Sequence, residues 1–502
     1  TSIRTPKDFS PVTGMCAVCT DQCPGPCEIG QSALNGQDML YPSERATSQA
    51  ASAKDYPVDL SHFNINGRCF GAVGTQPGNL AYSQVDLSTE IGTGKNKIKL
   101  KAPYIFPAMA KLNWQGYYCG AALTGVMAVI GEDMPTTDPN TVIRNGKVVE
   151  MPRLKEMYDS FYQYSDGYGA LIVQANPDDD RLQLLEYALQ EVGFEAVELK
   201  MAQAAKGIQG MGKIASIEKA LELKSYGYDV YPDPENAEIQ KAYEAGEEEP
   251  FYKIGRLPEW DTDWLIDRVK SLRKMGAKFI SLKTGPFHIA DTARFLIMAS
   301  QAGVDLVTVD TAGGGTGNSP LRMMNEWGYP TVYMIAAINR ICDKMKIKGY
   351  RIPAIAIAGG FAFEDQIFKG LALGTPYTRI IGVGRAAMAS AMVGHTAGMK
   401  VSSTMTGEEL GEMAVLRKKF GNAVTTIPSG ALGVYRYMHK TNVGLQQLMA
   451  LCRKYKLAAI SHQDIMPLTL QAATISGIPF AMDQDCDQVE AIINQTIKNG
   501  GY

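Results

Sequence analysis

A strong charge of either sign is absent from this sequence. Its 49 Lys and Arg residues nearly balance 52 Asp and Glu residues, and the formal net charge is -3. The charge therefore gives no reason to expect a nucleic acid or an anionic membrane as a partner. Long hydrophobic runs are also absent, because the longest, around Ala121–Ile130, is too short to span a bilayer. No signal peptide is recognisable, although Thr1 is an unusual first residue and leaves a processed leader open.

The nine cysteines lack the spacing of a disulfide scaffold. Four lie within Cys16–Cys27, and the others are scattered singly. In a chain of this length, such a distribution is typical of a metal site in a reducing compartment. We therefore expect a cytoplasmic protein with no membrane span and no nucleic-acid partner.

The chain divides into three parts by its residue pattern. Residues 1–100 are rich in Gly, Pro, Ser and Asn and predict an irregular segment. Over residues 101–400, short apolar runs alternate with amphipathic stretches, which is typical of βα units. Residues 401–502 predict a helical extension. The eight predicted strands are Tyr104–Met109, Ala170–Ala175, Ala196–Met201, Phe279–Lys283, Leu306–Asp310, Thr331–Met334, Ala354–Ala358 and Arg379–Val383.

Eight strands with helical crossovers fit a closed barrel or a doubly wound sheet, and the count and the glycine placement favour a (β/α)8 TIM barrel. A stretch of about 202–261, after the third predicted strand, is too long for a simple connection. We expect this insertion to cover the active site, because loops after barrel strands emerge on the catalytic face. The predicted helices include Leu182–Val192, Trp264–Met275, Ala290–Ala302, Ile335–Lys346, Glu364–Leu373, Glu408–Phe420 and Leu445–Tyr455.

Two glycine motifs follow the seventh and eighth predicted strands, where barrels commonly hold a phosphate. Gly359 and Gly360 follow the run Ala354–Ala358, and Gly384 precedes Arg385. Glycines let backbone N–H groups approach phosphate oxygens, and an arginine adds a charge-assisted bond. Either motif alone fits a tight turn better, but the two together favour the phosphate of a flavin.

Lysines follow two other predicted strands. Lys283 ends the fourth, where its ammonium can stabilise the anionic reduced ring of a flavin; a solvent-directed lysine is the alternative. Lys200 lies at the end of the third predicted strand, and Gln203 and Lys206 follow that strand. The three side chains can bind a carboxylate-bearing substrate or polarise its C=N bond.

A glycine-rich loop after the fifth predicted strand contains Gly314, Gly315 and Thr316. It lets a planar ring or a substrate lie against the backbone.

The N-terminal cysteines Cys16, Cys19, Cys23 and Cys27 can supply four thiolates to one cluster. Their spacing departs by one residue from a ferredoxin run, so a structural zinc and two disulfides stay open beside an iron–sulfur cluster, for which we expect 4Fe–4S. We favour iron–sulfur because a flavin enzyme without a nicotinamide fingerprint needs another electron source.

Several of these stretches resemble the FMN-binding domain of glutamate synthase and its stand-alone archaeal-type relatives, over roughly residues 102–399. Leu199–Lys206 is similar to the family's I-K-x-x-Q-G-A-K stretch, and Gly313–Pro320 to G-G-T-G-A-S-P. Lys283 falls on its V-K-L strand, and Pro107, Ala108 and Met109 on its first βα unit. The resemblance implies an FMN barrel that reduces 2-iminoglutarate to glutamate. Lys200, Gln203 and Lys206 would contact flavin or substrate, and Lys283 the flavin.

Three of the departures from this family bear directly on its activity. No glutaminase domain is present and Thr1 is not the nucleophilic cysteine, so glutamine hydrolysis would need a separate glutaminase subunit. The three-cysteine 3Fe–4S motif is missing, because residues 385–399 contain no cysteine. Ala312 and Gly313 stand where the family has a His-Asp pair, which leaves the substrate open.

Four functions follow from this reading. The first is an FMN oxidoreductase that reduces a 2-imino acid with electrons from ferredoxin or another donor subunit. The second is an amino-group transferase resembling N-methylglutamate synthase, and the third is a flavin and iron–sulfur subunit of a larger electron-transfer complex. The fourth is a phosphate-binding aldolase-type barrel with a structural zinc. Because relatives of this domain often assemble, we also expect a homo-oligomer.

Overall fold

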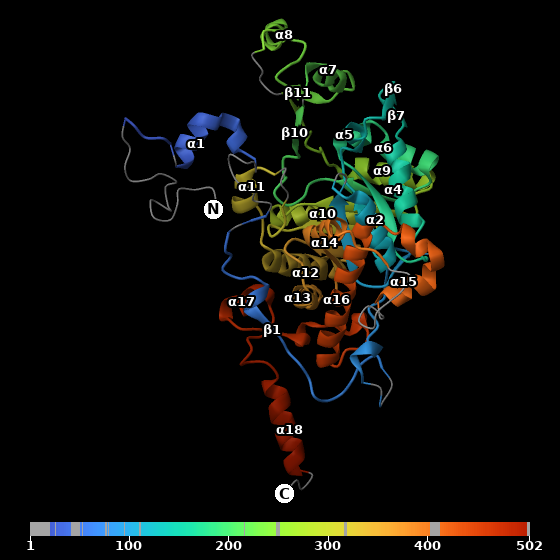
Figure 1. Ribbon diagram of the computed structural model, residues 1–502. Helices are drawn as coiled ribbons and strands as arrows, with labels where there is room; N and C mark the ends of the chain where they lie inside the picture. The colour runs from blue at the N-terminus through green and yellow to red at the C-terminus, as the bar shows by residue number, and fades with distance from the viewer. Residues whose placement is uncertain are drawn as a thin grey trace.

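Eight parallel strands close into a barrel (Figure 1), which confirms the predicted TIM-barrel fold. The computed structural model describes residues 21–25, 27–41, 51–52, 54–75, 78, 80–94, 96–109, 112–214, 216–246, 251–315, 319–401 and 412–498. Around the barrel the strands are β4 (Tyr104–Met109), β5 (Met127–Ile130), β8 (Ala170–Ala175), β9 (Ala196–Lys200), β13 (Phe279–Thr284), β14 (Leu306–Asp310), β15 (Ala354–Ala358) and β16 (Thr378–Gly382), and β16 pairs with β4.

The predicted strand count was right because two errors cancelled. Thr331–Met334 is not a strand but the first turn of α12 (Thr331–Ile347). The missing strand is β5, which lies inside the apolar run around Ala121–Ile130. That run begins as helix α2 (Trp114–Thr124) and turns at Gly125, whose φ of 74° reverses the chain into the strand. Short apolar runs do not by themselves distinguish strands from buried helix.

Helices cover the outside of the barrel. Four of the predicted ones are confirmed within four residues at either end, as α9, α10, α12 and α13. The predicted helix Leu182–Val192 is broken, because Gln183 has a φ of 57° and the segment continues as a short α-helix and a π-helical turn, Ala188–Val192. The helices of this layer are α2, α4 (Pro152–Tyr162), α5 (Pro177–Arg181), α6 (Leu184–Tyr187), α9 (Thr262–Lys274), α10 (Ile289–Ala302), α12, α13 (Glu364–Leu373) and α14 (Arg385–Thr396).

An apolar plug closes the end of the barrel where its strands begin. The hairpin of β2 (Thr89–Ile91) and β3 (Ile98–Leu100) places Ile91 and Leu100 against residues at the starts of the strands. Phe279, the first residue of β13, is 1% exposed in this cluster. The opposite end is therefore the one open to chemistry.

The long connection after β9 is folded. It forms a three-stranded antiparallel sheet in the order β10–β12–β11, with two helices, and projects beyond the end of the barrel (Figure 1). Its elements are β10 (Met211–Ile214), α7 (Ile217–Ser225), β11 (Asp229–Tyr231), α8 (Ala237–Glu244) and β12 (Phe251–Ile254). A short excursion after β5 contains α3 (Met134–Thr137), β6 (Val142–Arg144) and β7 (Lys147–Glu150).

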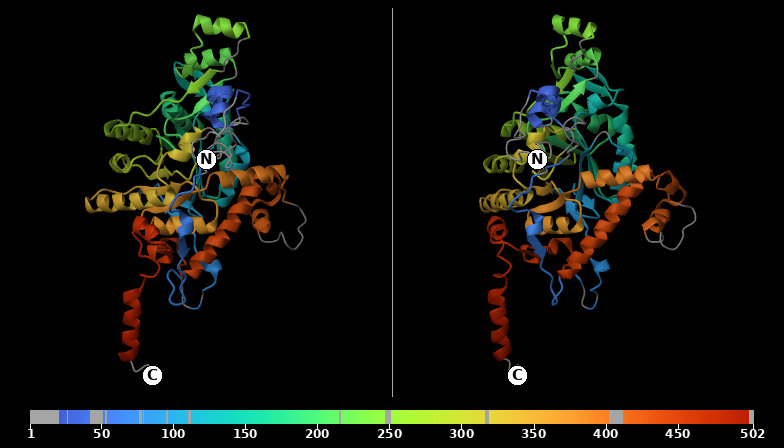
Figure 2. Two further views of the ribbon diagram at one scale, coloured as in Figure 1. Left: turned by 90° about the vertical axis from the view of Figure 1, so that its left-hand side faces the viewer. Right: turned by 60° about the vertical axis from the view of Figure 1, so that its left-hand side comes forward.

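The two termini contribute elements at both ends of the molecule. The N-terminal part includes α1 (Glu28–Asn35), near the insertion, whereas β1 (Phe63–Ile65) pairs with β17 (Ile465–Pro467). Helix α16 (Ser429–Leu451) packs on α2 and α14, and α18 (Cys486–Lys498) stands away from the body (Figure 2). The C-terminal part also contains α15 (Glu412–Phe420) and α17 (Leu470–Ser476).

Within the described part of the chain, no helix has the length and apolar character needed to cross a bilayer.

Candidate active site

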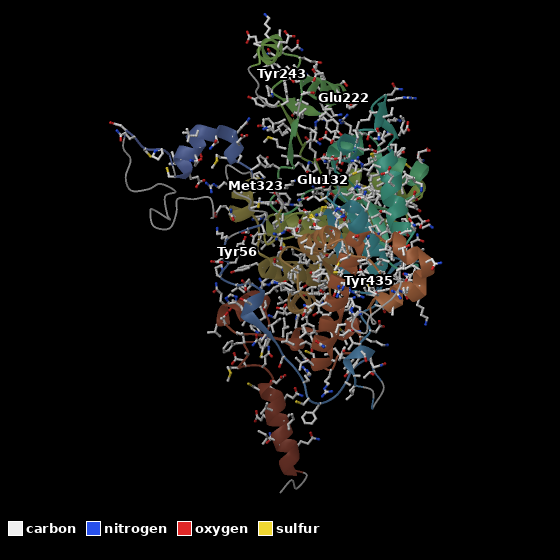
Figure 3. The ribbon with its side chains drawn as sticks, viewed as in Figure 1. Tyr56, Glu132, Glu222, Tyr243, Met323 and Tyr435 are labelled. Carbon is white, nitrogen blue, oxygen red and sulfur yellow. The ribbon has the colours of Figure 1, made fainter. Side chains whose placement is uncertain are left out.

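A buried cluster of opposite charges lies at the end of the barrel where the strands finish. Lys200, the last residue of β9, has a fully buried side chain whose ammonium forms an ion pair with Glu132, just after β5. The Lys206 Nζ atom lies 3.7 Å from the same Glu132 oxygen. Figure 3 shows Glu132 at this end of the barrel, below the insertion. The structure thus brings Lys200 and Lys206 together, on a carboxylate that the sequence reading missed.

The surroundings shift the pKa of both partners in this cluster. Burial alone would raise the pKa of Glu132, but Lys200, Lys206 and Lys283 outweigh it and hold the pKa well below the ordinary value. Burial lowers the pKa of Lys200, Glu132 opposes this effect, and the two other lysines add to it, so that the pKa is about 8. Glu132 is therefore an anion, whereas Lys200 can gain or lose a proton near neutral pH.

Lys283 lies beside Lys200 at the same level of the barrel. The two residues are partners in the parallel register of β13 and β9. Lys283 Nζ lies 3.7 Å from an Asp310 carboxylate oxygen at the end of β14. The lysine predicted to face a flavin therefore points into the barrel and not to solvent, since its side chain is only 4% exposed.

A polar layer supports these lysines from below. Glu198 accepts hydrogen bonds from Gln174 Nε2 at 2.6 Å and from Ser281 Oγ at 2.9 Å. Burial raises the pKa of Glu198, although Lys283 and these hydrogen bonds act against it. The charged residues of the mouth thus rest on a hydrogen-bonded floor, below which the barrel interior becomes apolar.

The two glycine motifs are neighbours in space. Ala358 and Gly382 are partners in the parallel register of β15 and β16, so both motifs emerge at one edge of the barrel mouth. Gly359 has a φ of 115°, and a Cβ there would lie 2.2 Å from Thr311 Oγ1. Thr331 Oγ1 donates a hydrogen bond of 2.9 Å to the Gly359 carbonyl. The turn after β15 therefore requires glycine and is held in one shape.

The space beside this turn is open to an anion. A Cβ on Gly360 would have its nearest neighbour 3.9 Å away, and Gly384 directly precedes α14. Arg385 is the first residue of that helix and has no ion-pair partner among the residues that the structure describes. A helix N-terminus, free backbone N–H groups and an arginine fit a phosphate group.

The end of β4 lies next to Gly384. A Cβ on Gly384 would be 3.7 Å from the Pro107 ring, and Tyr117 donates a hydrogen bond of 3.0 Å to the Pro107 carbonyl. Tyr118 donates to the Met109 carbonyl, which also accepts from the Gly131 N–H at 3.0 Å. Pro107, Ala108 and Met109 are half-buried at the mouth. They can therefore form one wall of a site beside the glycine motifs.

The glycine-rich loop after β14 packs closely at Gly314. A Cβ there would lie 2.6 Å from Asp310 Oδ1 and 2.8 Å from the Ala204 methyl group, so this glycine lets the loop lie on the lysine-bearing loop. Gly315 is described, and Thr316 lies outside the described residues. Gln203 packs its backbone against Gly285, and within the described residues its side chain makes no hydrogen bond to Lys200 or Lys206.

Two further residues that the sequence reading missed join the insertion to the mouth. Lys253, on β12, forms an ion pair of 2.5 Å with Asp133, the neighbour of Glu132. Asp133 also accepts a hydrogen bond of 3.1 Å from Asn176. The signal was present, because two acidic residues follow the apolar run 127–130 after a single glycine, Gly131, but that run was not read as a strand. A pocket of about 260 Å³ lies next to this contact, lined by Lys200, Arg181, Trp260 and Trp264 among others.

The cysteine motif is described only in part. Cys16 and Cys19 lie outside the described residues, within which no group of three or more His, Cys, Asp or Glu side chains forms a metal site. The Sγ atoms of Cys23 and Cys27 each accept a backbone N–H at 3.4 Å, from Gly25 and Gly30. The thiolate ligands of iron–sulfur clusters accept hydrogen bonds of this kind.

The barrel sequence is similar to known glutamate synthases. Residues 259–396 match a family described as the conserved region in glutamate synthase, so the part of the chain from α9 through α14 is glutamate synthase-like. The archaeal-type glutamate synthase [NADPH] of Thermotoga maritima is 27% identical over 180 residues, 36% of this chain and 32% of the relative. The glutamate synthase large subunit-like protein YerD of Bacillus subtilis is 24% identical over 189 residues, 37% of this chain and 32% of the relative. The matched region thus spans about a third of the length of these relatives.

Two solved structures are similar to this chain over most of its length, with TM-scores below 0.5. A flavocytochrome b2 variant with sulfite bound has a TM-score of 0.48 at 13% identity, covering 86% of this chain and 81% of that one. A mandelate oxidase variant with an FMN adduct has a TM-score of 0.43 at 13% identity, covering 81% and 88%.

Proposed function

We propose that this chain is an FMN-dependent oxidoreductase of the glutamate synthase type that reduces the C=N bond of a 2-imino acid, 2-iminoglutarate or a similar compound. The observation that carries the proposal is that the glycine motifs and the lysine cluster meet at one end of the barrel. Its support from sequence is the match over residues 259–396, which includes Lys283, Gly359 and Arg385.

The cofactor fits the mouth at two points. The phosphate of FMN would be held by the backbone of Gly359, Gly360 and Gly384 and by the guanidinium of Arg385. Lys283 would face the ring, opposite the wall of Pro107, Ala108 and Met109. FMN, when bound and reduced, supplies a hydride to an electron-poor carbon.

The lysine cluster fits an imino-dicarboxylate substrate. Lys200, Lys206 and Lys283 bring three ammonium groups to this mouth, and such groups can form charge-assisted hydrogen bonds with the carboxylates of a ligand. Lys200, with a pKa of about 8, holds a proton at its Nζ atom that it can pass to the substrate nitrogen. Glu132 orients that ammonium and keeps it charged at neutral pH.

The electrons would enter through an iron–sulfur cluster on Cys16, Cys19, Cys23 and Cys27, from ferredoxin or another donor subunit. The N–H···S bonds to Cys23 and Cys27 support this assignment. Ammonia would come from solution or from a separate glutaminase subunit.

The test begins with anaerobically purified protein, in which iron, zinc and acid-released FMN are quantified. The reduced enzyme is then mixed with 2-oxoglutarate and ammonium. We expect flavin reoxidation with formation of glutamate. A zinc protein without FMN, or reduced flavin that persists with every imino acid tried, would contradict the proposal. Exchange of methylamine into glutamate without electron flow would instead support the amino-group transferase.

A further inference from the structure

Helix α11 (Leu321–Glu326) holds the cysteine-bearing segment by three contacts. The Leu321 N–H donates a hydrogen bond of 2.9 Å to the Leu40 carbonyl. The guanidinium of Arg322 forms an ion pair with Glu28, which directly follows Cys27. Lys54 forms an ion pair of 2.5 Å with Glu326 at the other end of the helix. Glu28, Leu40 and Lys54 therefore contact α11 between its first and last residues, and Figures 1 and 2 show α1 beside it.

The other side of α11 touches the loops of the barrel mouth. Leu321 and Met324 form a small apolar cluster with Ala205, the neighbour of Lys206. Trp327, which ends the helix, lies against the loops after β9 and β13. Its ring occupies the space that a Cβ would need at Gly207 and at Gly285, each at 2.9 Å. One short helix therefore contacts both the cysteine segment and the loop that carries Lys206.

We propose that α11 docks the cluster-bearing segment on the barrel mouth, so that electrons reach the flavin from the α11 side, with Arg322 as a positioning residue. The proposal rests on the iron–sulfur relay of the proposed function and adds where that relay meets the barrel. Two electrons and one proton convert oxidised FMN into its reduced anion. An external donor would lose two electrons in total, a cluster held by the cysteine segment would pass them on one at a time, and the proton would come from solvent.

The location of Glu28 makes Arg322 the critical contact. Cys27 is the N-cap of α1, and Glu28 is the first residue of that helix. An ion pair to Glu28 therefore fixes the chain next to one thiol of the motif. The Glu28 side chain is only 14% exposed in the pair, so it is held against α11 and does not extend into solvent.

A charge exchange tests this docking in the holoenzyme. The variants are Arg322→Glu, Glu28→Arg and the double variant, with Arg322→Gln as a milder change. Arg294→Glu on α10 is the matched control, because it breaks an exposed ion pair, to Asp291, that lies outside these contacts. Iron and FMN content, amide hydrogen exchange over Glu28–Met39 and the rate of flavin reduction by reduced ferredoxin are measured for each.

We expect Arg322→Glu to retain iron and FMN, to exchange the α1 amides faster and to reduce its flavin about tenfold more slowly, because misplacement of a reacting group costs rate steeply. The double variant should recover both readouts, and Arg294→Glu should change neither. Iron-loaded Arg322→Glu and Arg322→Gln with wild-type exchange and reduction rates would overturn the docking alone. Wild-type protein that contains FMN and no iron would overturn both the docking and the relay of the proposed function.

Discussion

The two ends of the barrel interior differ in chemistry, because one is apolar and the other is charged. At the end where the strands begin, Ile91, Leu100 and Phe279 form an apolar plug under the hairpin. At the other end, Lys200 and Lys283 stand above a polar floor, paired with carboxylates. Apolar packing stabilises the barrel at one end, whereas the buried charges at the other give little net stability and are therefore better explained by chemistry. We therefore expect substitutions at the apolar end to lower stability and substitutions at the charged end to lower activity or FMN binding.

The largest expected effect is that of Lys200→Met on activity. In the proposed reaction the buried ammonium gives the proton to the substrate nitrogen, so we expect its loss to lower the rate of glutamate formation about a thousandfold. Folding and FMN content should persist, because Lys206 remains 3.7 Å from Glu132 and still neutralises it. Steady-state kinetics and flavin absorbance check both parts.

The control for this variant is Lys99→Met, which removes an exposed lysine from the hairpin at the opposite end. We expect Lys99→Met to change neither the rate of glutamate formation nor the FMN content. A Lys200→Met enzyme with more than a tenth of wild-type activity would remove this residue from the reaction.

Phe279→Ala should damage the apolar end and leave the chemistry intact. Because Phe279 is 1% exposed in the plug, its truncation leaves a cavity and should lower the free energy of unfolding by about 3–5 kcal/mol. Denaturant titration measures this loss, and Phe279→Leu should lose much less. Normal FMN affinity in folded Phe279→Ala is the expected companion result; a large change in FMN affinity would show that the two ends are coupled.

Arg385→Gln should weaken FMN binding by about tenfold, as expected for the loss of one charge-assisted hydrogen bond. Arg385 begins α14 directly after Gly384, and its side chain is exposed. The matched control is Arg379→Gln, an exposed arginine of β16, the strand before α14. Titration of each apoprotein with FMN gives the two dissociation constants. Equal weakening in both would indicate a general electrostatic effect and not a phosphate contact.

Sequence reasoning found the residues whose place in the barrel follows from a strand end. Lys200, Lys283 and Gly359 each end or follow a recognised apolar strand, and parallel strands in a barrel bring such positions to one mouth. The reasoning missed Glu132 and Asp133 because β5 is continuous with the apolar end of α2, and only the turn at Gly125 separates them. It could not find Lys253, because the ion pair to Asp133 joins residues 120 positions apart through a folded insertion.

The docking of the N-terminal segment was beyond the sequence for a similar reason. The ion pairs from Glu28 and Lys54 to α11 join side chains far apart in the chain, and no periodicity encodes them. The false strand Thr331–Met334 shows the converse, since its local β-type composition was overridden by the packing of α12 on the barrel.

The smallest effect expected is a shift in the pH profile. Activity that needs protonated Lys200 should fall as pH rises through about 8, the pKa of this lysine. Lys206 lowers that pKa by like-charge repulsion, so Lys206→Met should move the falling limb to higher pH. Lys253→Met is the control, because Lys253 acts on Asp133 and should leave the limb in place. If active Lys206→Met enzyme keeps the falling limb of its pH–activity profile at the wild-type position, a group other than Lys200 controls that limb. The charged end of the barrel would then bind the substrate without supplying its proton.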